Sequence, residues 1–176
     1  MLLISIMEVP KKKQRNHAHN LLRECLKTRK INYITDQTPI VRGEHGKPSL
    51  AEHPEIMYNM SHANGIAVCL MTDRECGVDC EGVRPYRPNV VKRAFSDNEK
   101  QLIENAPESE RDLLFFRLWT LKEAYVKAIG IGISYPLNTV EFSFEGNKIT
   151  TSVEGYKFRQ YILKNGKFVV SVCTKK

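Results

Sequence analysis

The chain has 176 residues, and its 27 lysines and arginines outnumber its 20 aspartates and glutamates, which gives a formal net charge of +7. With 41% hydrophobic and 27% charged residues it can bury a substantial core, which excludes a wholly disordered chain or a coiled coil. The length suits one domain or two small halves packed as one unit. The positive charge indicates an anionic partner: nucleic acid, a membrane surface, a phosphorylated ligand or an acidic protein.

The first nine residues, MLLISIMEV, are apolar, but this stretch is too short to span a bilayer and includes Glu8. The lysines at residues 11–13 follow the apolar run, whereas a signal peptide has the reverse order. We therefore expect a first strand that leads into a basic turn. The five cysteines are odd in number and include no CxxC pair, which favours reduced thiols in a cytoplasmic protein over disulfides or a zinc site.

In the first half of the chain, residues 17–30 carry apolar side chains at helical spacing, which predicts a short amphipathic helix. Residues 35–54 are rich in proline, glycine and charge and are expected to form a loop. The apolar run IAVCLM at residues 66–71 predicts a buried strand, and GVDCE at residues 77–81 predicts the end of the next strand.

In the second half, residues 82–88 contain two prolines and are the best candidate for a linker. Ser96 followed by Glu99 has the capping-box pattern and predicts the start of a helix. A second helix is expected at residues 112–129, ending at Gly130. The tail alternates as a sheet does, with turns at Gly146-Asn147 and Asn165-Gly166, and predicts strands at residues 139–145, 149–153, 156–163 and 168–173.

Asp79 and Glu81 are two residues apart, so on an extended strand both carboxylates point to one face and Cys80 points to the other. Two adjacent carboxylates repel each other unless a cation lies between them. Their hard oxygen ligands suit Mg²⁺, which typically takes one or two carboxylates together with phosphates and water. The alternative is a solvated strand end without chemistry.

Phe115, Trp119, Glu123 and Lys127 follow one another at intervals of four residues, so they form one stripe along the expected helix. A stripe that begins apolar and ends with an acid and a base is typical of a helix whose end reaches a cleft. Glu123 could complete a metal site, and Lys127 could meet a phosphate. The alternative is an ordinary surface pair worth about 0.3 kcal/mol.

Taken together, GVDCE and the later string WTLKEAYVK resemble the signature of the 4′-phosphopantetheinyl transferases. Within that superfamily the chain is similar to the Sfp type, whose single chain contains two similar halves. The resemblance runs from residue 46 to residue 137, and its further motifs are GKP (46–48), NMSH (59–62), FSDNE (95–99) and GIGIS (130–134).

The resemblance implies an enzyme that moves the 4′-phosphopantetheine arm of coenzyme A onto a serine of an acyl or peptidyl carrier protein and releases 3′,5′-ADP. By motif, Asp79, Glu81 and Glu123 would hold Mg²⁺ on the pyrophosphate. Lys127 would contact the phosphates, with Lys122 as a helper.

Further site residues follow from the same resemblance. Lys47, Ser61 and His62 match the part of the family that holds the nucleotide of coenzyme A, and Glu99 lies where the family places a candidate base for the carrier serine. Alternatives remain open for three of them: Glu99 as a helix cap, His62 as a structural histidine, and Lys122 as a solvent-facing side chain, about 100° around the helix from its glutamate neighbour.

We therefore expect an α+β fold of two similar, pseudo-twofold related halves, residues 1–81 and 82–176. Each would be a helix packed on a small antiparallel sheet, with coenzyme A in the cleft between them. The chain is short for the Sfp type, and the first half is the shortened one, so the basic residues that hold the 3′-phosphate are not placed by motif.

We expect a monomer that binds an acidic carrier protein rather than nucleic acid or a membrane. One competing class is a basic nucleic-acid-binding module, although no RNP-like or zinc-finger pattern is present. The other is a family member that binds coenzyme A or a carrier protein without turnover.

Overall fold

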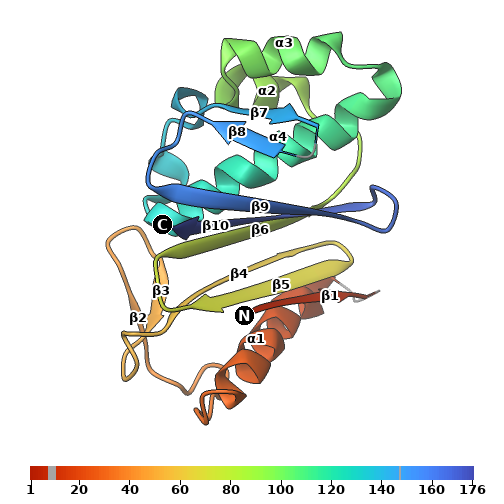
Figure 1. The fold of residues 1–176 in the computed structure, drawn as a ribbon. Coiled ribbons are helices and arrows are strands. Elements are labelled where there is room, and N and C mark those ends of the chain that lie inside the picture. Colours follow the sequence, from red (N-terminus) through yellow and green to blue (C-terminus); the bar gives the residue numbers. More distant parts are fainter. Residues whose placement is uncertain (8–10, 147) are drawn as a thin grey trace.

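The first half of the chain is a small antiparallel sheet covered by one helix. The computed structural model describes residues 1–7, 11–146 and 148–176. The elements of this half are β1 (Leu2–Ile6), α1 (Lys11–Lys27), β2 (Ile40–Arg42), β3 (Pro48–Leu50), β4 (Met57–Ala63) and β5 (Ile66–Thr72). The sheet has the order β1-β5-β4, and α1 covers its outer face with the buried side chains of Leu22, Cys25 and Leu26 (Figure 1).

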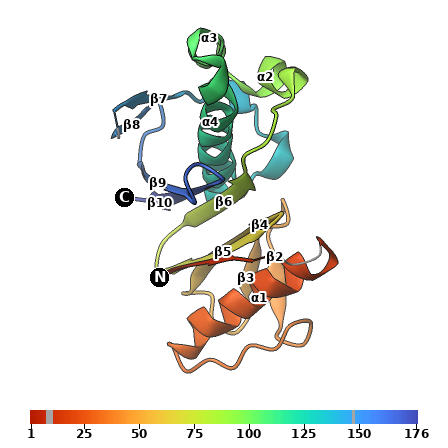
Figure 2. The same ribbon diagram turned by 90° about the vertical axis from the view of Figure 1, so that its right-hand side faces the viewer.

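The second half repeats this helix-on-sheet plan with more helices. Its elements are β6 (Cys76–Gly82), α2 (Pro88–Ala94), α3 (Asp97–Asn105), α4 (Glu108–Ile129), η1 (Gly132–Ser134), η2 (Leu137–Thr139), β7 (Phe142–Glu145), β8 (Lys148–Thr151), β9 (Tyr156–Leu163) and β10 (Phe168–Lys175). The three-stranded antiparallel sheet has the order β6-β10-β9, and β7 and β8 form a separate hairpin. α4 crosses the outer face of the sheet, with α2 and α3 beyond it (Figures 1 and 2).

The two halves meet sheet against sheet, so each sheet lies between its own helix and the other sheet (Figure 2). Val68 from β5, Val78 from β6 and Val170 from β10 are fully buried in this layer. β4 lies beside β6, and the backbone N–H of Val78 donates to Asn59 Oδ1 of β4 at 2.8 Å. Because β4 and β6 are edge strands of their sheets, the opposite edge strands, β1 and β9, lie at the other edge of this layer.

The predicted helix signals in the second half are confirmed. Ser96 accepts from the backbone N–H of Glu99, and Glu99 accepts from the backbone N–H of Ser96, so both arms of the capping box are present. α4 ends at Gly130, whose φ of 74° lies in the left-handed region that glycine adopts without strain. Strands were also predicted correctly at β5, β6, β8, β9 and β10, and β7 is shorter than predicted.

Several predictions in the less regular segments are wrong. Residues 11–13 form the start of α1 rather than a basic turn, and residues 35–54 contain the short hairpin β2-β3 rather than loop alone. The predicted turn at Asn147 and the end of the first strand at residues 8 and 9 fall outside the described residues.

The fold is a mixed arrangement of helices and small antiparallel sheets, as the sequence predicts; the pseudo-twofold relation remains a prediction. The proposed boundary between residues 81 and 82 falls inside β6, which pairs with β10 of the second half. By strand pairing, the chain passes between the halves at residues 73–75, and residues 83–87 connect β6 to α2. Among the described residues, no helix has both the length and the apolar character needed to cross a membrane.

Gly77 permits an unusually close approach of β6 to α4. A Cβ atom at this position would lie 2.0 Å from the carbonyl oxygen of Ala124 and 2.4 Å from the backbone nitrogen of Ala128. Both neighbours are backbone atoms of a helix and cannot turn aside as a side chain can. The absence of a side chain at residue 77 therefore sets the distance between this strand and this helix.

We expect Gly77→Ala to lower the free energy of unfolding by about 3 kcal/mol, because the new methyl group must push α4 away from β6. Gly82→Ala in the same strand is the matched control, since a Cβ there would meet its nearest atom at 3.6 Å, an ordinary contact. Urea denaturation of both variants measures the difference. Equal stability of the two variants would contradict the close approach.

Candidate active site

Asp79, Ser61 and Lys127 form a compact polar cluster where the two halves meet. Asp79 lies in β6 with its side chain 7% exposed. Its Oδ1 atom accepts hydrogen bonds from Ser61 Oγ at 2.8 Å and from Lys127 Nζ at 2.6 Å. Lys127 Nζ also donates to Ser61 Oγ at 3.1 Å. Because β4 supplies the serine while β6 and α4 supply the other two residues, both halves build this Asp79 cluster.

The charge of Lys127 is held by its acidic neighbours. Burial by itself would lower the pKa of Lys127. The charge of Asp79, its hydrogen bond and the charge of Glu123 outweigh burial, so the pKa is raised. The ammonium group therefore stays protonated next to the carboxylates and is a stable positive charge for this site.

Glu81 and Glu123 bring two further carboxylates toward Asp79. Burial raises the pKa of Glu81. The hydrogen bond from Arg84 Nη1 to Glu81 Oε2, 2.8 Å long, lowers this pKa, and the charge of Asp79 raises it further. Burial likewise raises the pKa of Glu123, with further contributions from Asp79 and Glu81 that Lys127 partly offsets. The charge of Asp79 therefore disfavours the charged forms of both Glu81 and Glu123.

A divalent cation suits this set of donors. Asp79 Oδ2 is buried and has no hydrogen-bond partner among the described residues. A cation would satisfy that oxygen and would offset the repulsion among the three carboxylates. In the described part of the chain, no three acidic, histidine or cysteine side chains stand close enough to hold an ion. Arg84 pairs with Glu81, so the arginine side chain would have to turn for a metal to bind there, whereas Lys127 bonds to Oδ1 of Asp79 and leaves Oδ2 open.

The residues predicted to hold the nucleotide lie on the first half, next to the Asp79 cluster. His62 follows Ser61 on β4, and its pKa is lowered by loss of water around the ring and then by the charges of Lys127 and Arg15. Lys47 lies between β2 and β3. Its ammonium group donates to the carbonyl oxygen of Cys76 at 3.1 Å and to the carbonyl oxygen of Ala128 at the end of α4. Burial lowers the pKa of Lys47. The nucleotide role of these residues remains a prediction.

Glu99 and Lys122 form a buried ion pair away from the Asp79 cluster. Both side chains are 0% exposed, and Lys122 Nζ lies 2.7 Å from Glu99 Oε2. Lys122 also donates to the carbonyl oxygens of Leu137 at 2.8 Å and Val140 at 2.5 Å. The other oxygen of Glu99 accepts from the backbone N–H of Phe142 at 2.9 Å. The suggestion that Lys122 faces solvent is therefore wrong, because its ammonium group links α4 to the segment before β7.

This arrangement bears on the predicted roles of both residues. All the oxygens of Glu99 and the donors of Lys122 are used within the fold, so neither group is free to take a proton or bind a phosphate in this conformation. The base role of Glu99 and the cofactor role of Lys122 remain predictions that would require the buried pair to open.

Two arginines beside the predicted residues escaped sequence reasoning. Arg84 pairs with Glu81, and Arg15 of α1 acts electrostatically on both His62 and His19. No spacing rule connects residue 15 with residue 62, because only the packing of α1 on the first sheet brings them together. Arg84 lies three residues after the last residue of GVDCE, and this closeness in sequence was the available signal.

Comparison with known proteins agrees with the site. The family model of the 4′-phosphopantetheinyl transferase superfamily matches residues 75–173, more than half of the chain. The chain belongs to this superfamily. The match spans β6 to β10 and so includes Asp79, Glu81, Glu123 and Lys127, as well as the buried pair of Glu99 and Lys122.

Curated members of the superfamily show the same likeness. The chain is 35% identical over 95 residues to the transferase psf-1 of Bacillus pumilus, 37% over 95 residues to HetI of a Nostoc species, and 31% over 96 residues to Sfp of Bacillus subtilis. These matches cover 54%, 51% and 54% of this chain. They cover 41%, 40% and 43% of the relatives, so the chain matches less than half of their length.

Solved structures of the superfamily are also similar in part. A holo-(acyl-carrier-protein) synthase from Bacillus anthracis, solved in complex with CoA (3′,5′-ADP), is 18% identical with a TM-score of 0.49, over 57% of this chain and 94% of that one. The Thermotoga maritima holo-[acyl-carrier-protein] synthase is 21% identical with a TM-score of 0.48, over 58% of this chain and 62% of that one.

We expect Glu123→Gln to stabilise the metal-free protein at neutral pH. Because the pKa of Glu123 is raised above 4.5, the folded chain binds this proton more tightly than the unfolded chain, and the ionised carboxylate costs stability. The gain should shrink as the pH falls through the raised pKa and vanish below 4.5. Thermal unfolding at several pH values measures it.

Added Mg²⁺ should raise the unfolding temperature of the natural chain and have little effect on Glu123→Gln. The matched control is Glu104→Gln, which changes an exposed glutamate on α3 and should leave the magnesium effect intact. A magnesium effect that survives Glu123→Gln would exclude Glu123 as a ligand.

Proposed function

We propose that this protein transfers the 4′-phosphopantetheine arm of coenzyme A to a serine of an apo acyl or peptidyl carrier protein and releases 3′,5′-ADP. The observation that carries the proposal is the Asp79 cluster at the junction of the halves, joined by Glu81 and Glu123. Asp79 beside a charged lysine, with Glu81 and Glu123 within electrostatic reach, suits a magnesium pyrophosphate once the acids draw together around the ion. Membership of the superfamily supports the same reaction.

In this proposal Asp79, Glu81 and Glu123 hold Mg²⁺, and the free Oδ2 atom of Asp79 is its first ligand. When bound, the ion would neutralise charge that develops on the pyrophosphate during attack at phosphorus. Arg84 would leave Glu81 as the ion binds and become available for a phosphate oxygen. The protein thus exchanges internal ion pairs for contacts to metal and substrate.

Lys127 acts on the phosphates directly. Its ammonium group stays charged and is placed by Asp79 and Ser61 at the same point as the carboxylates. A lysine fixed in this way supplies a positive charge to the developing oxyanions without reorganising during the step. We assign no proton transfer to Glu99, since its carboxylate is saturated inside the fold.

The first half holds the nucleotide. Ser61 of β4 joins the Asp79 cluster, His62 lies exposed on the other face of the same strand, and Lys47 fixes the β2-β3 hairpin against the end of α4. Arg15 of α1 is an exposed arginine that pairs with Asp36 at 3.6 Å, and its charge contributes to the lowered pKa of His62. We assign Arg15 to the 3′-phosphate of coenzyme A, the group for which the sequence offered no residue by motif.

The remaining positive charge suits an acidic carrier protein. A groove of about 710 Å³ beside Trp119 is lined by Arg87 and Arg93 together with apolar residues of α2. It adjoins a second groove lined by Glu81 and Arg84, so an acidic partner there would lie next to the Asp79 cluster. One chain supplies both sides of the site, which supports a monomer. The five cysteines are free and buried, which supports a cytoplasmic reaction.

We expect transfer to be measurable by mass spectrometry of an apo carrier protein incubated with the enzyme, coenzyme A and Mg²⁺. The carrier should gain one phosphopantetheine group, and Glu123→Ala should slow this about 100-fold or more. Glu104→Ala, on the exposed face of α3, should leave the rate unchanged.

Absence of the mass gain with fatty acid, polyketide and peptide carriers alike would reject the transfer, and would favour a member that binds without turnover. Transfer that persists after chelation of the metal would reject the magnesium site and leave the reaction standing. Binding to an oligonucleotide in preference to coenzyme A would favour the nucleic-acid-binding module instead.

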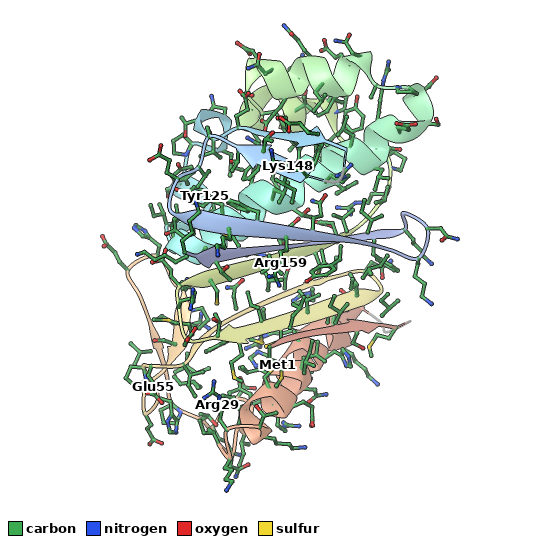
Figure 3. The ribbon with its side chains drawn as sticks, in the orientation of Figure 1. Met1, Arg29, Glu55, Tyr125, Lys148 and Arg159 are labelled. Carbon is green, nitrogen blue, oxygen red and sulfur yellow. The ribbon has the colours of Figure 1, made fainter. Side chains whose placement is uncertain are left out.

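We expect Arg15→Gln to raise the KM for coenzyme A about tenfold, since a charge-assisted contact to the 3′-phosphate is lost. With 3′-dephospho-coenzyme A the natural chain and the variant should have the same KM. Arg29→Gln, at the exposed C-terminal side of α1, is the control (Figure 3). An equal loss with both substrates would assign Arg15 to another part of the ligand.

A further inference from the structure

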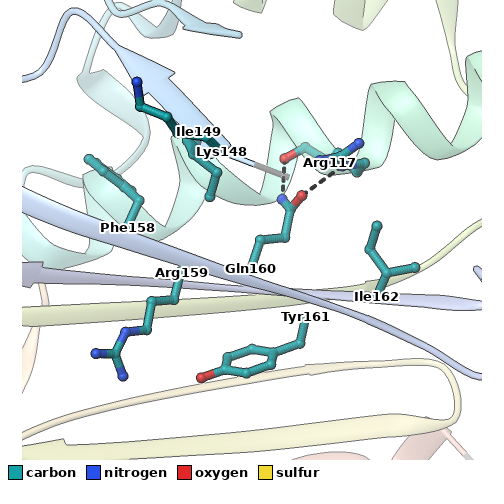
Figure 4. Close-up of a pocket in the computed structure, with 8 residues that line it drawn as sticks. All are labelled: Arg117, Lys148, Ile149, Phe158, Arg159, Gln160, Tyr161 and Ile162. Atoms are coloured by element: carbon teal, nitrogen blue, oxygen red, sulfur yellow. Dashed lines mark hydrogen bonds between the residues drawn. The ribbon is translucent and has the colours of Figure 1, made fainter. Parts of the chain in front are cut away.

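A pocket of about 660 Å³ lies between β8, β9 and α4, apart from the Asp79 cluster. β9 and β6 are at opposite edges of the same sheet, so the pocket and the carboxylate site are separated by the whole width of that sheet. Figure 4 shows Gln160 pointing from β9 toward Arg117 of α4, with Ile149 of β8 above. This volume is within the range of small-molecule sites.

Arg117 is held in a fixed position in this pocket. Its Nε atom donates to Gln160 Oε1 at 2.8 Å, and Gln160 Nε2 donates back to the carbonyl oxygen of Arg117 at 2.8 Å. Gln160 is fixed in turn by Ser171 Oγ at 2.9 Å. The guanidinium lies over the ring of Phe144, 3.7 Å from its centroid. Its terminal nitrogens therefore form a fork of known direction before any ligand binds.

No carboxylate of the described chain neutralises this guanidinium. None of the described residues that line the pocket is acidic. Lys148 at the rim is paired with Glu145 at 3.2 Å, whereas Arg117 has a hydrogen bond only to the neutral amide of Gln160. Burial lowers the pKa of Arg117, which shows that its charge has lost part of its water. A half-buried, unneutralised fork favours a carboxylate as its partner.

Three of the remaining lining residues are apolar, and Lys148, Arg159 and Tyr161 complete the wall. Phe158 and Ile162 point into the pocket from β9, on the same side as Gln160, and Ile149 faces them from β8 (Figure 4). Ile162 is 45% exposed, a large apolar surface left open to water. Arg159 alternates with these residues and points to the other side of β9 (Figures 3 and 4).

We propose that this pocket binds a small amphiphilic carboxylate, with the carboxylate on the Arg117 fork and an apolar chain along Phe158, Ile149 and Ile162. The chemical class is a medium-chain acyl carboxylate. The inference needs neither magnesium nor coenzyme A and does not depend on the proposed transfer. It adds a second ligand site to the C-terminal half, on the face of α4 that the reaction does not use.

Titration with octanoate tests the site, with the full chain observed by nitrogen-15 NMR and isothermal calorimetry. Octanoate should move the side-chain amide signal of Gln160, and acetate and 1-octanol should bind at least about tenfold more weakly, since each lacks one half of the ligand. Arg117→Gln should weaken octanoate binding about tenfold or more, and Lys157→Gln, the matched control at an exposed cation of β9 that does not line this pocket, should not.

Ile162→Gln provides a second variant that leaves the Arg117 network intact and should also weaken octanoate binding. Its exposed position makes it independent of any folding defect caused by Arg117→Gln. Equal weakening by Arg117→Gln and Lys157→Gln would show attraction by net charge alone and would overturn the site. Failure of octanoate to move the Gln160 signal would also overturn the site. Arg117 would then have only the structural role of linking α4 to β9.

Discussion

The contact between β6 and α4 at Gly77 is the constraint on which the rest of the site depends. With no side chain at this position, the strand lies against the helix backbone at a distance that any methyl group would prevent. Asp79 is two residues further along the strand, and Glu123 and Lys127 are on the helix at the same level. Asp79 comes close to Glu123 and Lys127 because the backbones of β6 and α4 are in contact at Gly77.

The carboxylates around Asp79 repel one another in the folded chain, and this repulsion lowers its stability. Glu81 and Glu123 both have raised pKa values through burial and mutual repulsion, and Arg84 and Lys127 offset only part of it. The buried pair of Glu99 and Lys122 shows the contrast, since every donor and acceptor there is satisfied within the chain. The two lysines of α4 thus have different partners: both oxygens of Glu99 are satisfied beside Lys122, whereas Asp79 beside Lys127 keeps one oxygen without a partner among the described residues.

Sequence reasoning succeeded where local chemistry determines the outcome. The capping box at Ser96, the end of α4 at Gly130 and the stripe that ends in Glu123 and Lys127 depend on neighbours along one helix. It could not place what long-range packing decides. Lys122 has the spacing of a surface residue but is buried by the segment before β7, and Arg15 approaches His62 only because α1 packs on the first sheet.

Lys47 gives the junction between the halves a further property. The last carbonyl groups of a helix lack partners within it and carry its negative end, and here Ala128 receives its hydrogen bond from a lysine in the other half of the chain. The hairpin of the first half thus serves as the C-terminal cap of α4. The halves are consequently not independent modules: a hinge motion that separated them would uncap α4, so opening of the cleft and order at the end of that helix are coupled.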